Sequence, residues 1–133
     1  KKQKMPGTEV FEYALIRVVP RVERGECLNT GVILYSKHHR FLAVRYVVDR
    51  PRLQAFSPTL DLEEVERYLK VWDWICQGDA RGGPIAALER PARFRWLTAP
   101  RSTIIQPSAV HPGRCSDPAG KLAALFADYV LGE

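Results

Sequence analysis

The sequence has few cysteines and no long apolar run. Its three cysteines, Cys27, Cys76 and Cys115, are odd in number and share no CxxC spacing, which predicts free thiols in a reduced, cytoplasmic protein. No apolar run approaches the roughly 18 residues that a transmembrane helix needs. We therefore expect neither a disulfide-stabilised secreted domain nor a membrane protein.

Familiar catalytic and cofactor motifs are also missing. The chain contains no Walker glycine loop, no HExxH, no GxSxG and no dinucleotide fingerprint. His38 and His39 are adjacent and so point in different directions, and His111 with Cys115 lacks a full ligand set at a recognised spacing. We accordingly expect no metal site and no cofactor, and the sequence leaves open whether the protein is an enzyme.

Length and composition fit a single globular domain. The chain has 133 residues, of which 46% are hydrophobic and 26% charged. The formal net charge is +5, but Lys1, Lys2 and Lys4 supply three of these charges, so the balance is weak evidence for a nucleic-acid partner. A patterned strand follows the basic N-terminus, which argues against a signal peptide. We expect a disordered leader over 1–8 and one domain over 9–133.

Three runs rich in β-branched and aromatic residues, between Phe11 and Val48, predict an antiparallel three-stranded meander. Arg17 interrupts the first run, and the long connection that follows carries Glu26 and Asn29. These two polar residues either bind a ligand or tie the loop to nearby backbone. Arg17 either keeps its charged head in water or pairs, and we expect it to be coupled to Glu26.

Helical periodicity replaces the strand pattern over 61–78. Asp61 is placed as an N-cap and Gly78 as a C-terminal stop. A last helix should begin after Asp117 and Pro118. The apolar stripe of the long helix consists of Leu62, Val65, Leu69, Trp72 and Cys76. Trp74 lies off this stripe, so its exposure would mark a surface for a partner or for self-association.

Between the two helices, residues 92–97 alternate apolar residues with Arg93 and Arg95, which predicts a half-buried strand. A short extended run at Ile104 and Ile105 follows, and 111–115 is typical of a loop. The whole pattern predicts the α+β class. We expect an antiparallel sheet of three to five strands packed against a long central helix and a C-terminal helix.

Arginines, hydroxyls and a histidine gather in the second half of the chain. Arginine forks suit phosphate or carboxylate groups, and a neighbouring histidine could transfer a proton. The simpler interpretation is that the arginines pair with glutamates on solvated faces. The predicted binding site takes residues from both halves of the sequence. It consists of Arg17, Glu26, Asn29, Arg95, Arg101, Ser102 and His111.

The blocks 13–35, YALIRVVPRVERGECLNTGVILY, and 94–113, FRWLTAPRSTIIQPSAVHPG, resemble a bacterial family named domain of unknown function 3037. The resemblance covers nearly the whole chain after Thr8. The chain departs from the family pattern at Cys27 or Leu28, where Phe is usual, and at Thr30, where Val is usual. The resemblance implies a small cytoplasmic protein encoded beside a HipA-like kinase, and hence a protein partner. The family pattern includes Arg17, Glu26, Asn29, Gly31, Arg95, Trp96, Arg101, Ser102 and His111.

These observations favour a non-enzymatic accessory or binding protein with an arginine-rich site for an anion or a partner. The alternative is a small hydrolase or nuclease that acts on a phosphate-containing substrate. A metal-dependent enzyme would need several carboxylates together, with Asp49 or Asp117 brought beside Glu26. A phosphate-containing ligand and a homo-oligomer both stay open at this point.

Overall fold

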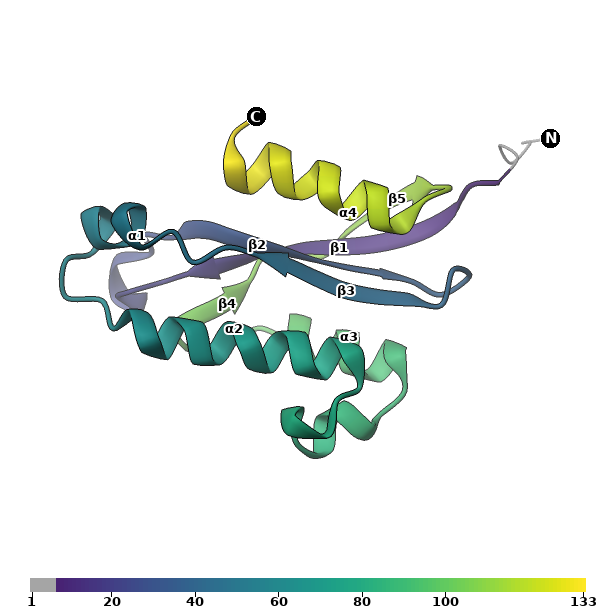
Figure 1. The fold of residues 1–133 in the computed structure, drawn as a ribbon, viewed down its shortest axis with the longest axis horizontal. Helices are drawn as coiled ribbons and strands as arrows, with labels where there is room; N and C mark the ends of the chain where they lie inside the picture. Colours follow the sequence, from purple (N-terminus) through teal and green to yellow (C-terminus); the bar gives the residue numbers. More distant parts are fainter. Residues whose placement is uncertain (1–6) are drawn as a thin grey trace.

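The computed structural model describes residues 7–133. Strands form one antiparallel five-stranded sheet, and helices cover both of its faces (Figure 1). The class is α+β, as predicted. The expected leader over 1–8 lies almost entirely outside the described residues. None of the helices in the described part of the chain is long and apolar enough to cross a bilayer.

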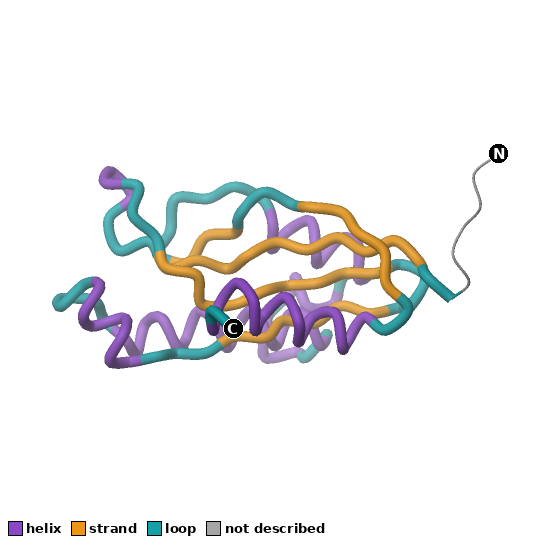
Figure 2. The backbone as a smooth tube through the Cα atoms, turned by 90° about the horizontal axis from the view of Figure 1, so that it is seen from above, coloured by secondary structure: helices purple, strands orange, loops and turns teal. Residues whose placement is uncertain are grey.

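β1 (Glu9–Val18) lies inside the sheet. It pairs with β2 (Leu28–Ser36), which pairs in turn with β3 (Phe41–Tyr46), so the predicted meander is confirmed. Two short strands, β4 (Ile105–Pro107) and β5 (His111–Cys115), pair with the opposite edge of β1. The view from above shows these strands side by side (Figure 2). Residues from the two ends of the sequence therefore meet along β1.

Both faces of the sheet are buried. Successive residues of β1 point to opposite sides, and apolar residues of this strand pack into a cluster on each side. Ala14 and Ile16 pack with α2 (Leu62–Gln77) and α3 (Arg90–Thr98). Phe11 and Leu15 pack with α4 (Pro118–Phe126) on the other side. Figure 1 shows α4 on one side of the sheet and α2 with α3 on the other. The remaining helical segments are α1 (Arg50–Phe56), the 3-10 turns Val22–Arg24, Ala80–Gly82 and Pro84–Ala87, and the π turn Ala127–Leu131.

The expected helix ends are confirmed. Asp61 accepts hydrogen bonds from the backbone of Glu63 and Glu64 at the start of α2, and Gly78 ends it with a φ of 70°. Asp117 accepts a bond from the backbone N–H of Gly120 at the start of α4. These caps satisfy amides that have no partner within the helix. The seven-residue helix α1 was not predicted, because it is too short to show a period.

Two segments differ from the expectation. Residues 92–97 form part of helix α3 and not a strand, because Pro91 suits the first turn of a helix and the buried residues Arg93, Phe94 and Leu97 lie at helical spacing. Residues 111–115 form strand β5 and not a loop. Pro112 is tolerated there because β5 lies at an edge of the sheet. Gly113 is needed because a Cβ atom would lie 2.5 Å from the ring of Phe11.

Candidate functional site

The seven predicted site residues lie in three separate parts of the molecule. Arg17, Asn29 and His111 belong to the α4 side of the sheet, Glu26 to the connection between β1 and β2, and Arg95, Arg101 and Ser102 to α3 and the segment after it. The structure therefore does not bring the seven residues into one cleft.

The α4 side holds a chain of polar contacts that ends at the C-terminal turn. Arg17 Nε donates to Asn29 Oδ1 at 3.3 Å, and Asn29 Nδ2 donates to the Tyr129 carbonyl at 3.2 Å. The ring of Tyr13 lies 5.4 Å from that of His111 and 6.4 Å from that of Tyr129. Burial and the hydrogen bond with Tyr129 raise the pKa of Tyr13. Arg17 and Asn29 thus hold the last helical turn against the sheet.

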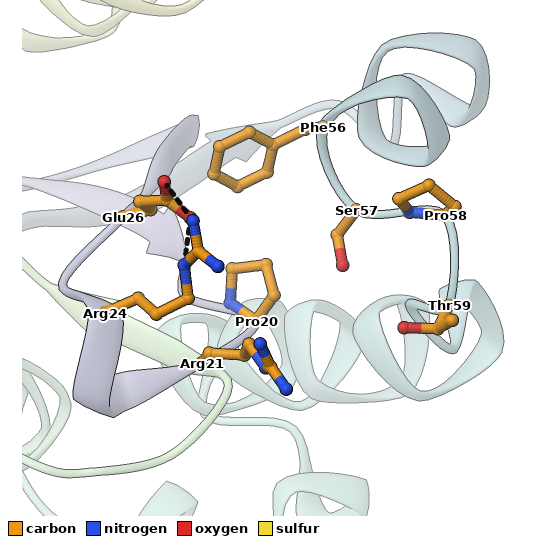
Figure 3. A pocket seen from close by; sticks show the side chains of 8 residues that line it. All are labelled: Pro20, Arg21, Arg24, Glu26, Phe56, Ser57, Pro58 and Thr59. Atoms are coloured by element: carbon orange, nitrogen blue, oxygen red, sulfur yellow. Dashed lines mark hydrogen bonds and ion pairs between the residues drawn. The ribbon is translucent and has the colours of Figure 1, made fainter.

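Glu26 lies in an open, polar hollow between the β1–β2 connection and the segment after α1 (Figure 3). Its carboxylate contacts Arg24 Nε at 3.0 Å and Nη2 at 3.2 Å, whereas Arg17 contacts Asn29. Exposed pairs of this kind contribute about 0–1 kcal/mol to stability. The hollow measures about 490 Å³ and is lined by Pro20, Arg21, Arg24, Glu26, Phe56, Ser57, Pro58 and Thr59.

The other carboxylates considered for catalysis have structural roles. Asp49 accepts a hydrogen bond from the backbone of Arg52 at the start of α1, and Asp117 caps α4. Within residues 7–133, no group of three His, Cys, Asp or Glu side chains is arranged to hold a metal ion. The described fold therefore does not gather Glu26, Asp49 and Asp117.

Arg95 lies on the opposite face of the sheet from His111. Its Nη1 and Nη2 donate to the two carboxylate oxygens of Glu12 at 3.2 and 3.1 Å. Glu12 and Tyr13 are consecutive on β1 and so face opposite sides, and the His111 ring packs on Tyr13. Arg95 is thus already paired with a carboxylate, and it does not share a face with the histidine.

Arg101 lies in an apolar groove between α2, α3 and β4. The groove measures about 420 Å³. Trp72 is 3% exposed, while Tyr68 and Trp96 are 40% and 43% exposed. The side chains that line the groove are Tyr68, Val71, Trp72, Trp96, Arg101, Thr103 and Ile105. Solvent-exposed aromatic surface of this kind, next to a cation, is typical of a binding site.

Contacts on several sides fix the Arg101 guanidinium. Its central carbon lies 4.8 Å from the ring centroid of Trp96 and 5.6 Å from that of Trp72. Nη2 donates to the Trp96 carbonyl, and Nε donates to the Ala99 carbonyl at 3.3 Å. Burial lowers the pKa of Arg101, although an arginine stays charged at neutral pH. Among residues 7–133, no carboxylate forms an ion pair with Arg101.

Residue type and spacing identified Arg101 as a site residue but missed the other side of the groove. Trp74, the aromatic residue expected to mark a surface, is half-buried, and Arg81 lies 4.9 Å from its ring centroid. The exposed aromatic of α2 is Tyr68, which is four residues before Trp72 and so lies on the same helix face. That spacing was the available signal. Ser102 is exposed and is not among the groove's lining residues.

Comparison with known families gives a match that covers most of the chain. The model of the family described as "Protein of unknown function (DUF3037)" matches residues 13–130. No curated protein and no solved structure matches the sequence. The matched range includes the groove and both sides of the sheet.

Proposed function

The chain belongs to the DUF3037 family, and from that premise we propose that it is a binding protein whose groove around Arg101 holds an acidic, apolar segment of a protein partner. One observation carries the proposal. The Arg101 guanidinium lies over the rings of both Trp96 and Trp72 in an apolar groove and has no carboxylate partner within the described residues.

The groove supports recognition by two kinds of contact at once. Trp96 and Tyr68 offer large, partly exposed rings whose burial favours association. Tryptophan, tyrosine and arginine are also the residue types most enriched among those that dominate binding energies. A carboxylate placed against Arg101 would gain from the low polarity around it, since charge-assisted hydrogen bonds strengthen when water is excluded. The matching ligand therefore combines an aromatic or aliphatic side chain with a nearby carboxylate.

The size of the groove indicates a segment and not a large flat surface. A volume of about 420 Å³ accommodates a few side chains. The first partner to test is a HipA-like kinase, which the family resemblance implied. A second copy of this chain is the other protein that could present a suitable segment.

A peptide-display selection tests the proposal whichever protein supplies the segment. Random 12-residue peptides are selected on the wild-type protein and on Arg101→Ala. We expect the wild type to select peptides with Asp or Glu within a few positions of an aromatic or aliphatic residue. Arg101→Ala should lose the acidic preference and keep the apolar one.

Arg95→Ala is the matched control for charge, because Arg95 is exposed and already paired with Glu12. It should select the same peptides as the wild type. Selection of peptides without an acidic preference, or the same acidic preference in Arg101→Ala, would contradict the proposed function.

A further inference from the structure

A second pocket, distinct from the groove, lies between the β2–β3 turn and the N-terminus of α3. It measures about 460 Å³. Four basic side chains and one carboxylate are among its lining residues, so its charge is strongly positive. The lining residues are Tyr35, Lys37, Arg40, Glu89, Arg90, Pro91 and Arg93.

Arg93 is the unusual member of this set because it is 8% exposed. Its Nη1 donates to the carbonyls of Ile75 and Cys76, each at 2.8 Å, at the C-terminal end of α2. Its buried Nε has no hydrogen-bond partner. Within residues 7–133, no carboxylate pairs with its charge. A buried cation with an unsatisfied donor is rare in folded proteins and calls for an explanation.

The two carbonyls bind only one nitrogen of the Arg93 guanidinium. Both bonds leave from Nη1, whereas Nε and Nη2 form another edge. The N–H groups of that edge are parallel, and they match two oxygens of one phosphate or carboxylate group. Arg93 thus brings a largely buried positive charge to the lining of the pocket.

The other three basic residues are exposed and have no carboxylate partner among the described residues. Lys37 and Arg40 lie in one turn, where the Arg40 amide donates to the Lys37 carbonyl at 3.1 Å. Arg40 has a φ of 51°, a conformation that is uncommon for a residue other than glycine. Arg90 begins α3, whose N-cap residue Glu89 makes no side-chain capping bond. The positive end of this helix dipole adds to the charge of the pocket.

We propose that this pocket binds the phosphate group of a small phosphorylated molecule. A phosphate carries enough charge to satisfy several cations at once, and its oxygens accept charge-assisted hydrogen bonds from lysine and arginine side chains such as those that line this pocket. The pocket's volume is in the range that holds a nucleotide-sized ligand. The site stands apart from the Arg101 groove and is independent of the function proposed for that groove.

Calorimetric titration at low salt tests the site with two probes, pyrophosphate and adenosine 5′-monophosphate. The test variant is the double replacement Lys37→Ala with Arg40→Ala, which changes exposed residues only. We expect saturable binding of at least one probe by the wild type and affinity lower by about tenfold or more in the double variant. Arg114→Ala removes an exposed charge on β5 and should bind like the wild type.

The probe that binds more tightly identifies the source of the phosphate, a free inorganic group or a nucleotide. Nuclear magnetic resonance of the wild type adds a reading of Arg93 itself, whose Nε–H signal should shift on titration. Absence of saturable binding by both probes would overturn the site. Equal affinity in the double variant, or an unmoved Arg93 signal at saturation, would do so as well.

Discussion

The central carbon of the Arg101 guanidinium lies 4.8 Å from the ring centroid of Trp96, and the same guanidinium donates a hydrogen bond to the Trp96 carbonyl. Each residue therefore fixes the other: the ring limits the motion of the cation, and the cation ties the end of α3 to the segment after it. A binding group that is already held in place loses less conformational entropy when a ligand arrives. This relationship is the basis for the predictions about the groove.

Replacement of Trp96 by alanine should weaken binding more than it weakens the fold. Trp96 is 43% exposed, so we expect a loss of about 1–2 kcal/mol in unfolding free energy and a loss of at least about tenfold in affinity for a selected acidic peptide. Urea unfolding and calorimetry measure the two effects. Leu88→Ala is the control, since Leu88 is 44% exposed and outside the groove. An equal loss of affinity in Leu88→Ala would count against the groove.

Replacement of Arg101 by lysine separates charge from shape. Lysine keeps the positive charge, but it has no planar group to lie over the indole rings and no fork to hold a carboxylate. We expect Arg101→Lys to retain a preference for acidic peptides with affinity between those of the wild type and Arg101→Ala. Calorimetry at two salt concentrations measures it. Wild-type affinity in Arg101→Lys would show that the stacked geometry is unimportant.

Alkaline pH should destabilise the fold through Cys76. Burial, with a smaller effect of Asp73, raises the pKa of the Cys76 thiol far above its ordinary value of 9.0. Above pH 9 the thiol is ionised only in the unfolded chain, so unfolding releases a proton and its free energy falls as pH rises. Between pH 9.5 and 10.5 the wild type should lose about 1 kcal/mol more than Cys76→Ala.

The control for this comparison is Cys27→Ala, because Cys27 is exposed. Urea unfolding at several pH values should show the wild-type slope in this variant. If Cys76→Ala keeps the same slope, other groups cause the alkaline loss.

Gly31 should not tolerate a side chain. A Cβ atom there would lie 2.8 Å from the Arg45 carbonyl oxygen and 2.9 Å from Tyr46 Cβ, both on the neighbouring strand β3. We expect Gly31→Ala to lower the unfolding free energy by about 1–3 kcal/mol, as overpacking does in other cores. Chemical unfolding measures it, and unchanged stability would show that β2 and β3 can separate without cost.

The sequence predicted the elements that carry long, regular patterns. The meander and α2 were correct in order and type, because β-branched runs and the spacing of Leu62, Val65 and Leu69 reflect burial directly. Short segments contain too few repeats to distinguish a strand from a helix. Two cycles of alternation around Arg93 and Arg95 suggested a strand, although the chain forms helix α3 there. The edge position of β5 explains why a proline is compatible with that strand, and the close ring of Phe11 explains the glycine.

The candidate sites could be predicted only in part, because distance in space depends on pairings that a sequence does not contain. Arg101 was recognised, but its groove needed Tyr68 of α2 and Ile105 of β4 to be brought beside it. The Arg93 pocket depends on a turn more than fifty residues earlier in the chain and on the end of α2. Residue type indicated anion binding, and only the fold grouped the arginines.

A double-mutant cycle measures most directly whether Arg101 recognises a carboxylate. The wild type and Arg101→Ala are titrated with a selected acidic peptide and with the same peptide carrying the corresponding amide. We expect the two changes to be non-additive, with a coupling energy of about 1–2 kcal/mol between Arg101 and the peptide carboxylate. Additivity within about 0.3–0.5 kcal/mol would contradict recognition of a carboxylate by Arg101.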